Sequence, residues 1–94
     1  MTSLSVIIPN YNRAALIGET LDNVFAQTRP PDEVIVVDDG STDDSVAVIE
    51  RYGARITLIR QANAGPGAAR NRGLAAARGE LIQFMSMSMN PGSA

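Results

Sequence analysis

The chain has 94 residues, a formal net charge of -2 and 45% hydrophobic residues, which suits one small globular domain. All eight basic residues are arginine, and the chain has no histidine and no cysteine. This composition excludes a Schiff-base or P-loop lysine, a histidine general base, a disulfide and a zinc site of the usual kind. Because no basic block is present, we do not expect the chain to bind nucleic acid.

The sequence also carries no membrane signal. No apolar run approaches the ~18 residues of a membrane-spanning helix. The N-terminus has no basic segment followed by a long apolar core, so no signal peptide is expected. We therefore expect a cytoplasmic chain with no membrane span.

The first half of the chain alternates strand and helix. Residues 4–8 are predicted to form a strand that ends at Pro9, followed by a loop over residues 10–13. Apolar residues at three- and four-residue spacing predict a helix over residues 14–27. Two prolines end this helix within residues 28–32. The β-branched run over residues 33–38 predicts a second strand, buried on both faces as in a parallel sheet.

The second half repeats the alternation. Ser41, Thr42 or Asp43 is expected to cap a helix that runs to about residue 52, and Gly53 fits the left-handed position after it. Strands are predicted over residues 56–60 and 80–85. Between them, a loop over residues 61–65 precedes a helix that begins at Pro66 and runs to about residue 78.

The order β-α-β-α-β-α-β predicts an α/β fold with a parallel four-stranded sheet and right-handed crossovers. The third helix is rich in alanine and glycine, so we expect it to lie close against the sheet. Residues 1–85 are interpreted as one domain. Residues 86–94 differ in character and read as a flexible tail.

Two adjacent carboxylates, Asp38 and Asp39, end the second strand and mark a candidate site. Open α/β sheets bind their ligands at this edge. Adjacent strand residues point to opposite faces, so a shared metal ion is awkward. The spacing does not fit a dehalogenase-type phosphatase, and a response-regulator site would need a lysine. For Asp38, capping of the following turn and a role in the site remain alternatives. For Asp39 we favour direct contact with a bound ligand.

A carboxylate accepts hydrogen bonds and does not donate them, which bears on the base that Asp39 would read. Uracil presents N3–H, and guanine presents N1–H and N2–H, whereas cytosine N3 and adenine N1 are acceptors. Asp39 therefore favours uridine or guanosine nucleotides. Tyr11, in the loop after the first strand, offers a flat face on which a base can stack. Arg70 lies near the N-terminus of the third helix, where anions are attracted.

Four segments occur in order at fitting intervals. They are Pro-x-Tyr-Asn at residues 9–12, Val-Asp-Asp-Gly-Ser-Thr-Asp at residues 37–43, Asn63-x-Gly with Ala-Arg-Asn-x-Gly at residues 69–73, and Gly-Glu-x-Ile-x-Phe at residues 79–84. Over residues 3 to about 85 the chain resembles the nucleotide-binding half of inverting family 2 glycosyltransferases, which have the Rossmann-like GT-A fold.

The resemblance implies that Pro9 and Tyr11 line a nucleotide pocket, that Asp39 reads the base and that Arg70 lies near the nucleotide, with Asp38 beside them. It also implies the sheet order 3-2-1-4 with helices on both faces. The expected partner is a nucleotide-diphosphate sugar, with the UDP form favoured and the GDP form as the alternative.

The chain departs from the family after the fourth strand. There the family has an Asp-x-Asp motif that holds Mg²⁺ or Mn²⁺ against the diphosphate. Here Ser86 and Ser88 occupy those positions, and hydroxyls and thioethers are poor ligands for hard cations. No catalytic base carboxylate follows either. We therefore expect no metal or cofactor site in this chain, although the full-length family member would use Mg or Mn.

Two functions follow from these expectations. The first is a truncated glycosyltransferase domain that binds a donor nucleotide but is inactive alone in sugar transfer to an acceptor hydroxyl. The alternative is a non-enzymatic fragment that self-associates through its exposed fourth strand, because an open apolar edge tends to pair with another chain.

Overall fold

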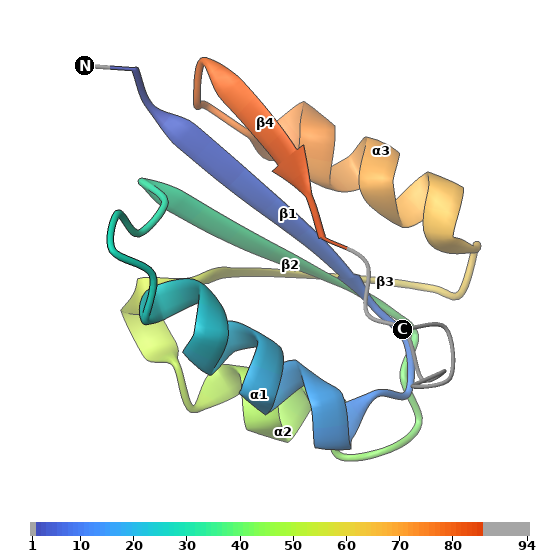
Figure 1. The fold of residues 1–94 in the computed structure, drawn as a ribbon. Coiled ribbons are helices and arrows are strands. Elements are labelled where there is room, and N and C mark those ends of the chain that lie inside the picture. The colour runs from blue at the N-terminus through green and yellow to red at the C-terminus, as the bar shows by residue number, and fades with distance from the viewer. Residues whose placement is uncertain (1, 86–94) are drawn as a thin grey trace, which may run out of the picture.

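The computed structural model describes residues 2–85, which form an α/β domain (Figure 1). The elements in chain order are β1 (Leu4–Asn10), α1 (Ala14–Phe25), β2 (Glu33–Asp39), α2 (Ser45–Glu50), a 3₁₀ turn (Gly53–Arg55), β3 (Thr57–Gln61), α3 (Pro66–Ala76) and β4 (Leu81–Phe84). The strands pair in parallel in the order β3-β2-β1-β4, which confirms the predicted topology. In this part of the chain, no helix is long and apolar enough to cross a bilayer.

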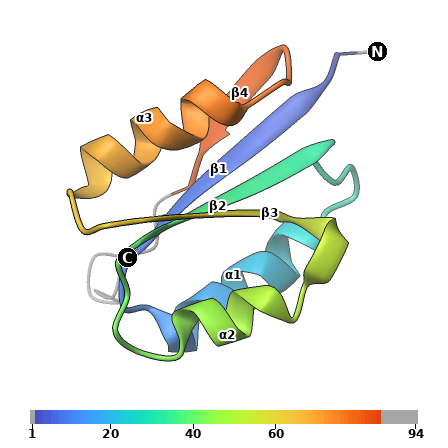
Figure 2. The same cartoon turned by 180° about the vertical axis from the view of Figure 1, so that it is seen from behind.

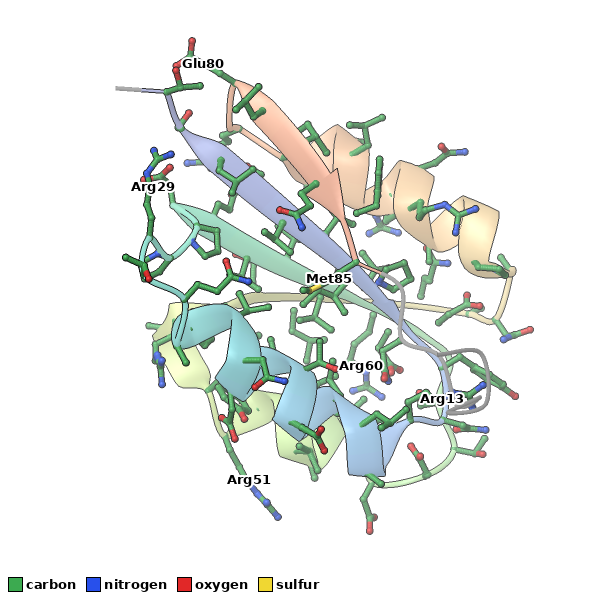
Figure 3. All side chains as sticks on the ribbon, viewed as in Figure 1. Arg13, Arg29, Arg51, Arg60, Glu80 and Met85 are labelled. Carbon is green, nitrogen blue, oxygen red and sulfur yellow. The ribbon has the colours of Figure 1, made fainter. Side chains whose placement is uncertain are left out.

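The helices cover both faces of the sheet. Figures 1 and 2 show α1 and α2 side by side on one face and α3 alone on the other. The larger core lies under α1 and α2. Its buried members come from β1, β2 and both helices, and they are Val6, Ile8, Ile17, Leu21, Val24, Val34, Val36 and Ile49. Met85 packs against this core just after β4 (Figure 3).

The opposite face is thinner because α3 lies close against the strands. Ala69 and Gly73 are its buried residues. A Cβ placed on Gly73 would collide with Cγ2 of Ile7 and lie 3.2 Å from Cγ2 of Val37. Glycine therefore permits this close approach, and the expected packing of the third helix is confirmed.

Four helix boundaries differ from the prediction: the start of α2, and the ends of α1, α2 and α3, each of which lies two residues before its predicted position. We expected a cap at residues 41–43, but α2 begins only at Ser45 and ends at Glu50, two residues before Tyr52. Gly53 does adopt the predicted left-handed backbone, with φ of +55°. The predicted end of the third helix at residue 78 is also wrong, because α3 ends at Ala76.

The early end of α3 has a physical cause in the sheet. The N–H of Arg78 donates to Oε1 of Glu33 at 2.9 Å, and the N–H of Gly79 donates to Oγ of Ser5 at 2.8 Å. These side chains take over backbone donors that a longer helix would have bonded internally. The turn into β4 is thereby fixed to the starts of β1 and β2.

Strand β1 continues to Asn10, two residues past Ile8, its predicted last residue. The carbonyl of Ile7 accepts from the N–H of Met85, so alternate residues of β1 direct their backbone groups toward β4. Pro9 lies two residues after Ile7, so its backbone nitrogen, which carries no hydrogen, also faces the β4 side. The last described pair on that side is Ile7 with Phe84. Proline is tolerated there because it interrupts no described ladder bond with β2.

Candidate functional site

A cavity opens at the carboxyl ends of the parallel strands, on the side of α3. It has a volume of about 440 Å³, within the range of small-molecule sites. Its described lining comes from the ends of β1 and β2, the β3–α3 loop and the start of α3, and consists of Pro9, Asn10, Tyr11, Arg13, Asp39, Asn63, Gly65, Pro66 and Ala69. Three of the predicted site residues, Pro9, Tyr11 and Asp39, are therefore brought together.

The loop after β1 forms one rim of the cavity. Tyr11 is 45% exposed there, so one large part of its ring is open to a ligand. Asn12 has φ of +49°, and its Oδ1 accepts from the N–H groups of Thr42 and Asp43 at 2.7 and 3.3 Å. These two bonds hold the loop after β1 against the loop after β2.

Asp38 lies inside the protein and not among the described residues that line the cavity. Its Oδ2 accepts from the N–H of Ser41 at 3.0 Å, and its Oδ1 accepts from Ser41 Oγ and Asn10 Nδ2. The predicted capping of the following turn by Asp38 is confirmed. Its predicted place in nucleotide binding stays a prediction.

Asp39 lines the cavity from the end of β2 and is only 4% exposed. Its Oδ1 accepts from Gln61 Nε2 and the N–H of Ala64, both at 2.8 Å. Its Oδ2 accepts from the N–H of Gly65 at 2.9 Å and from Asn63 Nδ2 at 3.2 Å. These four donors thus occupy the roughly four acceptor positions that a carboxylate offers.

The environment of Asp39 favours the charged form. Burial raises the pKa of Asp39, but hydrogen bonds from Gln61, Ala64 and Gly65 lower it by more. The net pKa lies below the usual value of an aspartate. The residue is therefore a carboxylate at neutral pH, and it can only accept hydrogen bonds.

Several lining residues were missed by the sequence reasoning. Arg13 places a cationic side chain at the cavity beside the carboxyl end of β1, while Arg51 points away from the molecule (Figure 3). Asn10 and Asn63 also line the cavity. Asn10 is the last residue of β1 and Asn63 is the second residue after β3, and this position at the carboxyl ends of strands is the signal that could have found them. Arg70 is half-buried on α3 and is not among the described lining residues.

Buried Asn10 carries an unusual polar atom. It is 2% exposed, and its Nδ2 donates to Asp38 Oδ1 at 3.0 Å and Ser41 Oγ at 3.3 Å. Its Oδ1 is buried and has no hydrogen-bond partner. An unsatisfied buried acceptor costs about 1–3 kcal/mol, so the donor bonds to Asp38 and Ser41 must outweigh it.

Hard divalent cations prefer oxygen ligands, and Mg²⁺ is usually held by one or two carboxylates together with substrate phosphates and water. Among residues 2–85, no group of three or more acidic, histidine or cysteine side chains is close enough to hold one. Ser86 and Ser88, at the positions where the resemblance places Asp-x-Asp, lie outside the described residues. Residues 2–85 thus hold no preformed carboxylate cluster for Mg²⁺ or Mn²⁺.

The family model of glycosyl transferase family 2 matches residues 5–86. The chain belongs to this family. An uncharacterized glycosyltransferase of Nostoc sp. is 46% identical over 86 residues, which cover 87% of this chain and 27% of the relative. The chain therefore spans about a quarter of the length of this relative.

Solved structures of glycosyltransferases share the fold. A mannosyltransferase from Pyrobaculum calidifontis, in complex with GDP-Man and Mn²⁺, matches with a TM-score of 0.83 and 35% identity. The match covers 90% of this chain and 27% of the mannosyltransferase. Glucosyl-3-phosphoglycerate synthase from Mycobacterium tuberculosis, with Mn²⁺, UDP and glucosyl-3-phosphoglycerate, matches with a TM-score of 0.75 and 31% identity, over 90% of this chain and 33% of the synthase. The described sheet and helices are thus those of a GT-A glycosyltransferase.

Proposed function

We propose that this chain binds the nucleotide part of a nucleotide-diphosphate sugar, with uridine favoured and guanosine as the alternative. The cavity at the carboxyl ends of β1 and β2 carries the proposal, because it joins an open aromatic ring to a buried carboxylate. The two solved relatives hold GDP-Man and UDP, which supports a nucleoside diphosphate as the class of ligand.

In the proposed binding mode, different residues of the cavity contact the base and the diphosphate. The base stacks on Tyr11, and an N–H of uracil or guanine donates to Asp39. The start of α3 at Pro66 and the cation of Arg13 favour the diphosphate, since helix N-termini and arginine both attract anions. Arg70 in the second turn of α3 is proposed to lie near the same group.

The Asp39 carboxylate already accepts four hydrogen bonds, which limits how a base can bind to it. Every described acceptor position of Asp39 is in use, so a base N–H has to displace one existing donor. The bond from Asn63 Nδ2, at 3.2 Å, is the longest of the four, and Asn63 itself lines the cavity. We propose that the Asn63 amide gives way to the base, while the backbone donors stay in place.

Titration calorimetry with UDP, GDP, CDP and ADP tests the proposed preference. We expect UDP to bind best, with GDP next, and tightest binding of CDP or ADP would contradict the role of Asp39. Stacking of a base on an aromatic ring contributes about 1–3 kcal/mol, so Tyr11→Ala should weaken UDP binding by about 5- to 150-fold. Tyr52→Phe is the matched control, because Tyr52 lies in the groove between α1 and α2.

We propose further that this chain alone does not transfer sugar. The described residues offer no cluster of three or more acidic side chains for a cation that would neutralise the leaving diphosphate. Donor hydrolysis and transfer to hydroxyl acceptors should be measured with and without Mn²⁺. Turnover that depends on the metal would overturn this part of the proposal, while leaving nucleotide binding untouched.

A second candidate function follows from the outer edge of β4. No strand of the described residues pairs with this edge, and residues 81–84 carry no charge. Leu81 is 54% exposed and Phe84 is 44% exposed. Such an edge is a template for pairing, and we propose a second copy of this chain as its occupant. Sedimentation velocity should then show a dimer, and Leu81→Lys should dissociate it. Ala75→Lys, on the exposed surface of α3, is the control and should leave the dimer intact. A monomer at high concentration would count against this second function.

A further inference from the structure

The loop between β3 and α3 has little apolar packing of its own. Ala62, Asn63 and Ala64 are all exposed, and Gly65 adopts a left-handed backbone with φ of +98°. No side chain caps the N-terminus of α3. Apolar burial therefore does not explain why this loop holds one conformation, and its hydrogen bonds have to do so.

Those hydrogen bonds converge on one residue. The Asp39 carboxylate accepts from the N–H groups of Ala64 and Gly65 and from the side-chain amides of Gln61 and Asn63. The backbone carbonyl of Asp39 accepts a further bond from Asn63 Nδ2 at 3.0 Å. All five bonds run from a segment 22 to 26 residues further along the chain to the end of β2.

The fit between the two segments is close. A Cβ on Gly40, the residue after Asp39, would lie 2.8 Å from the backbone nitrogen of Asn63. The loop thus rests directly on the backbone that follows β2. Asn63, Gly65 and Pro66 in turn form one wall of the cavity. The segment that forms this wall is thus the same segment that binds Asp39.

We propose that Asp39 is a positioning residue whose carboxylate folds residues 61–65 and so builds one wall of the cavity before any ligand arrives. This role is separate from contact with a nucleotide, and it exists in the free protein. An Asp39 variant that fails to bind nucleotide would therefore not show that the base touches Asp39, because the variant would also lack the wall.

Amide hydrogen exchange in the nucleotide-free protein tests the proposal. Asp39→Asn keeps the size of the side chain but replaces one acceptor oxygen by an NH₂ donor. Hydrogen bonds to a charged group contribute enough that we expect exchange at Ala64 and Gly65 to accelerate by about ten- to a hundredfold. Asp39→Glu keeps the carboxylate and should restore part of the protection. Amides of the buried strands β1 and β2 should accelerate less than those of Ala64 and Gly65 in both variants, because they report only the change in global stability.

Asp43→Asn provides a matched control at the same end of the sheet. Asp43 also accepts from two backbone N–H groups, those of Ser45 at 2.9 Å and Ala14 at 3.1 Å. It is not among the described lining residues of the cavity. We expect its replacement to release the amides of Ala14 and Ser45 while Ala64 and Gly65 keep their protection.

The outcomes separate cleanly. Unchanged exchange at Ala64 and Gly65 in Asp39→Asn overturns the proposal, and so does equal loss of protection in the Asn and Glu variants. If Asp39→Asn does not fold, the isotope-labelled wild-type chain gives the answer. Scalar couplings across the hydrogen bonds should link the Ala64 and Gly65 amide nitrogens to the Asp39 carboxyl carbon, and their absence refutes the arrangement. None of these measurements contains a nucleotide, so a failure of the proposed function is detected separately.

Discussion

Gly73 gives a sharp test of the packing between α3 and the sheet. A Cβ at this position would collide with Cγ2 of Ile7 and lie 3.2 Å from Cγ2 of Val37. Both neighbours are fully buried, so neither can move aside without disturbing the core. Overpacking of this kind costs about 1–3 kcal/mol. Replacing glycine by alanine in a helix contributes about 1 kcal/mol in the opposite direction.

We therefore expect Gly73→Ala to lower the free energy of unfolding by up to about 2 kcal/mol. Gly67→Ala is the matched control in the same helix, because a Cβ there meets nothing within 4 Å. It should raise the free energy of unfolding by about 0.4–1 kcal/mol. Urea unfolding followed by far-ultraviolet circular dichroism measures both values. If Gly73→Ala is as stable as Gly67→Ala, α3 does not lie against β1 as described.

Three further predictions concern charge and turns. Burial raises the pKa of Asp39 and of Asp43, but hydrogen bonds lower both pKa values by more. Each carboxylate therefore stabilises the fold above about pH 4, and this stabilisation is lost as the pH falls further. The urea midpoint should drop between pH 6 and pH 3, and a constant midpoint would contradict this prediction. Gly79→Ala should cost about 1–3 kcal/mol in the same unfolding assay, because its Cβ would lie 2.7 Å from the backbone nitrogen of Ser5. Arg55→Gln should cost about 0.5–1 kcal/mol, since the guanidinium lies 4.0 Å from the centre of the Phe25 ring, and an unchanged midpoint would argue against a cation–π contribution.

The sequence predicted those features that depend on local pattern. The β-branched run before Asp38 indicated a buried parallel strand, and the apolar stripe of residues 14–27 indicated α1 to within two residues of its end. The parallel sheet followed from the alternation of these elements. The position of the cavity followed from a general rule about the carboxyl ends of strands.

The features that were missed depend on partners far along the chain. The loop that ends where α2 begins is tied to Asn12, whose Oδ1 accepts from N–H groups 30 and 31 residues away. The end of α3 is set by Glu33 and Ser5, which lie 45 and 74 residues before the groups that they bind. Periodicity and capping rules consider only neighbours in sequence, so they could not place either boundary. The four donors to Asp39 were hidden for the same reason.

The direct adjacency of Asp38 and Asp39 has a structural logic. Successive residues of a strand point to opposite faces, so the pair serves both sides of the sheet. Asp38 binds Asn10 and Ser41 on the side of α1 and α2, and Asp39 binds residues 61–65 on the side of α3.

A spacer residue between the two acids would reverse this arrangement. Asp-x-Asp on a strand directs both carboxylates to one face, where they can share a cation. Asp-Asp separates them, so each is free to bind the backbone and side chains of its own loop. The end of β2 is therefore suited to holding the walls of the cavity in place, and any cation for the diphosphate would have to be bound by other groups.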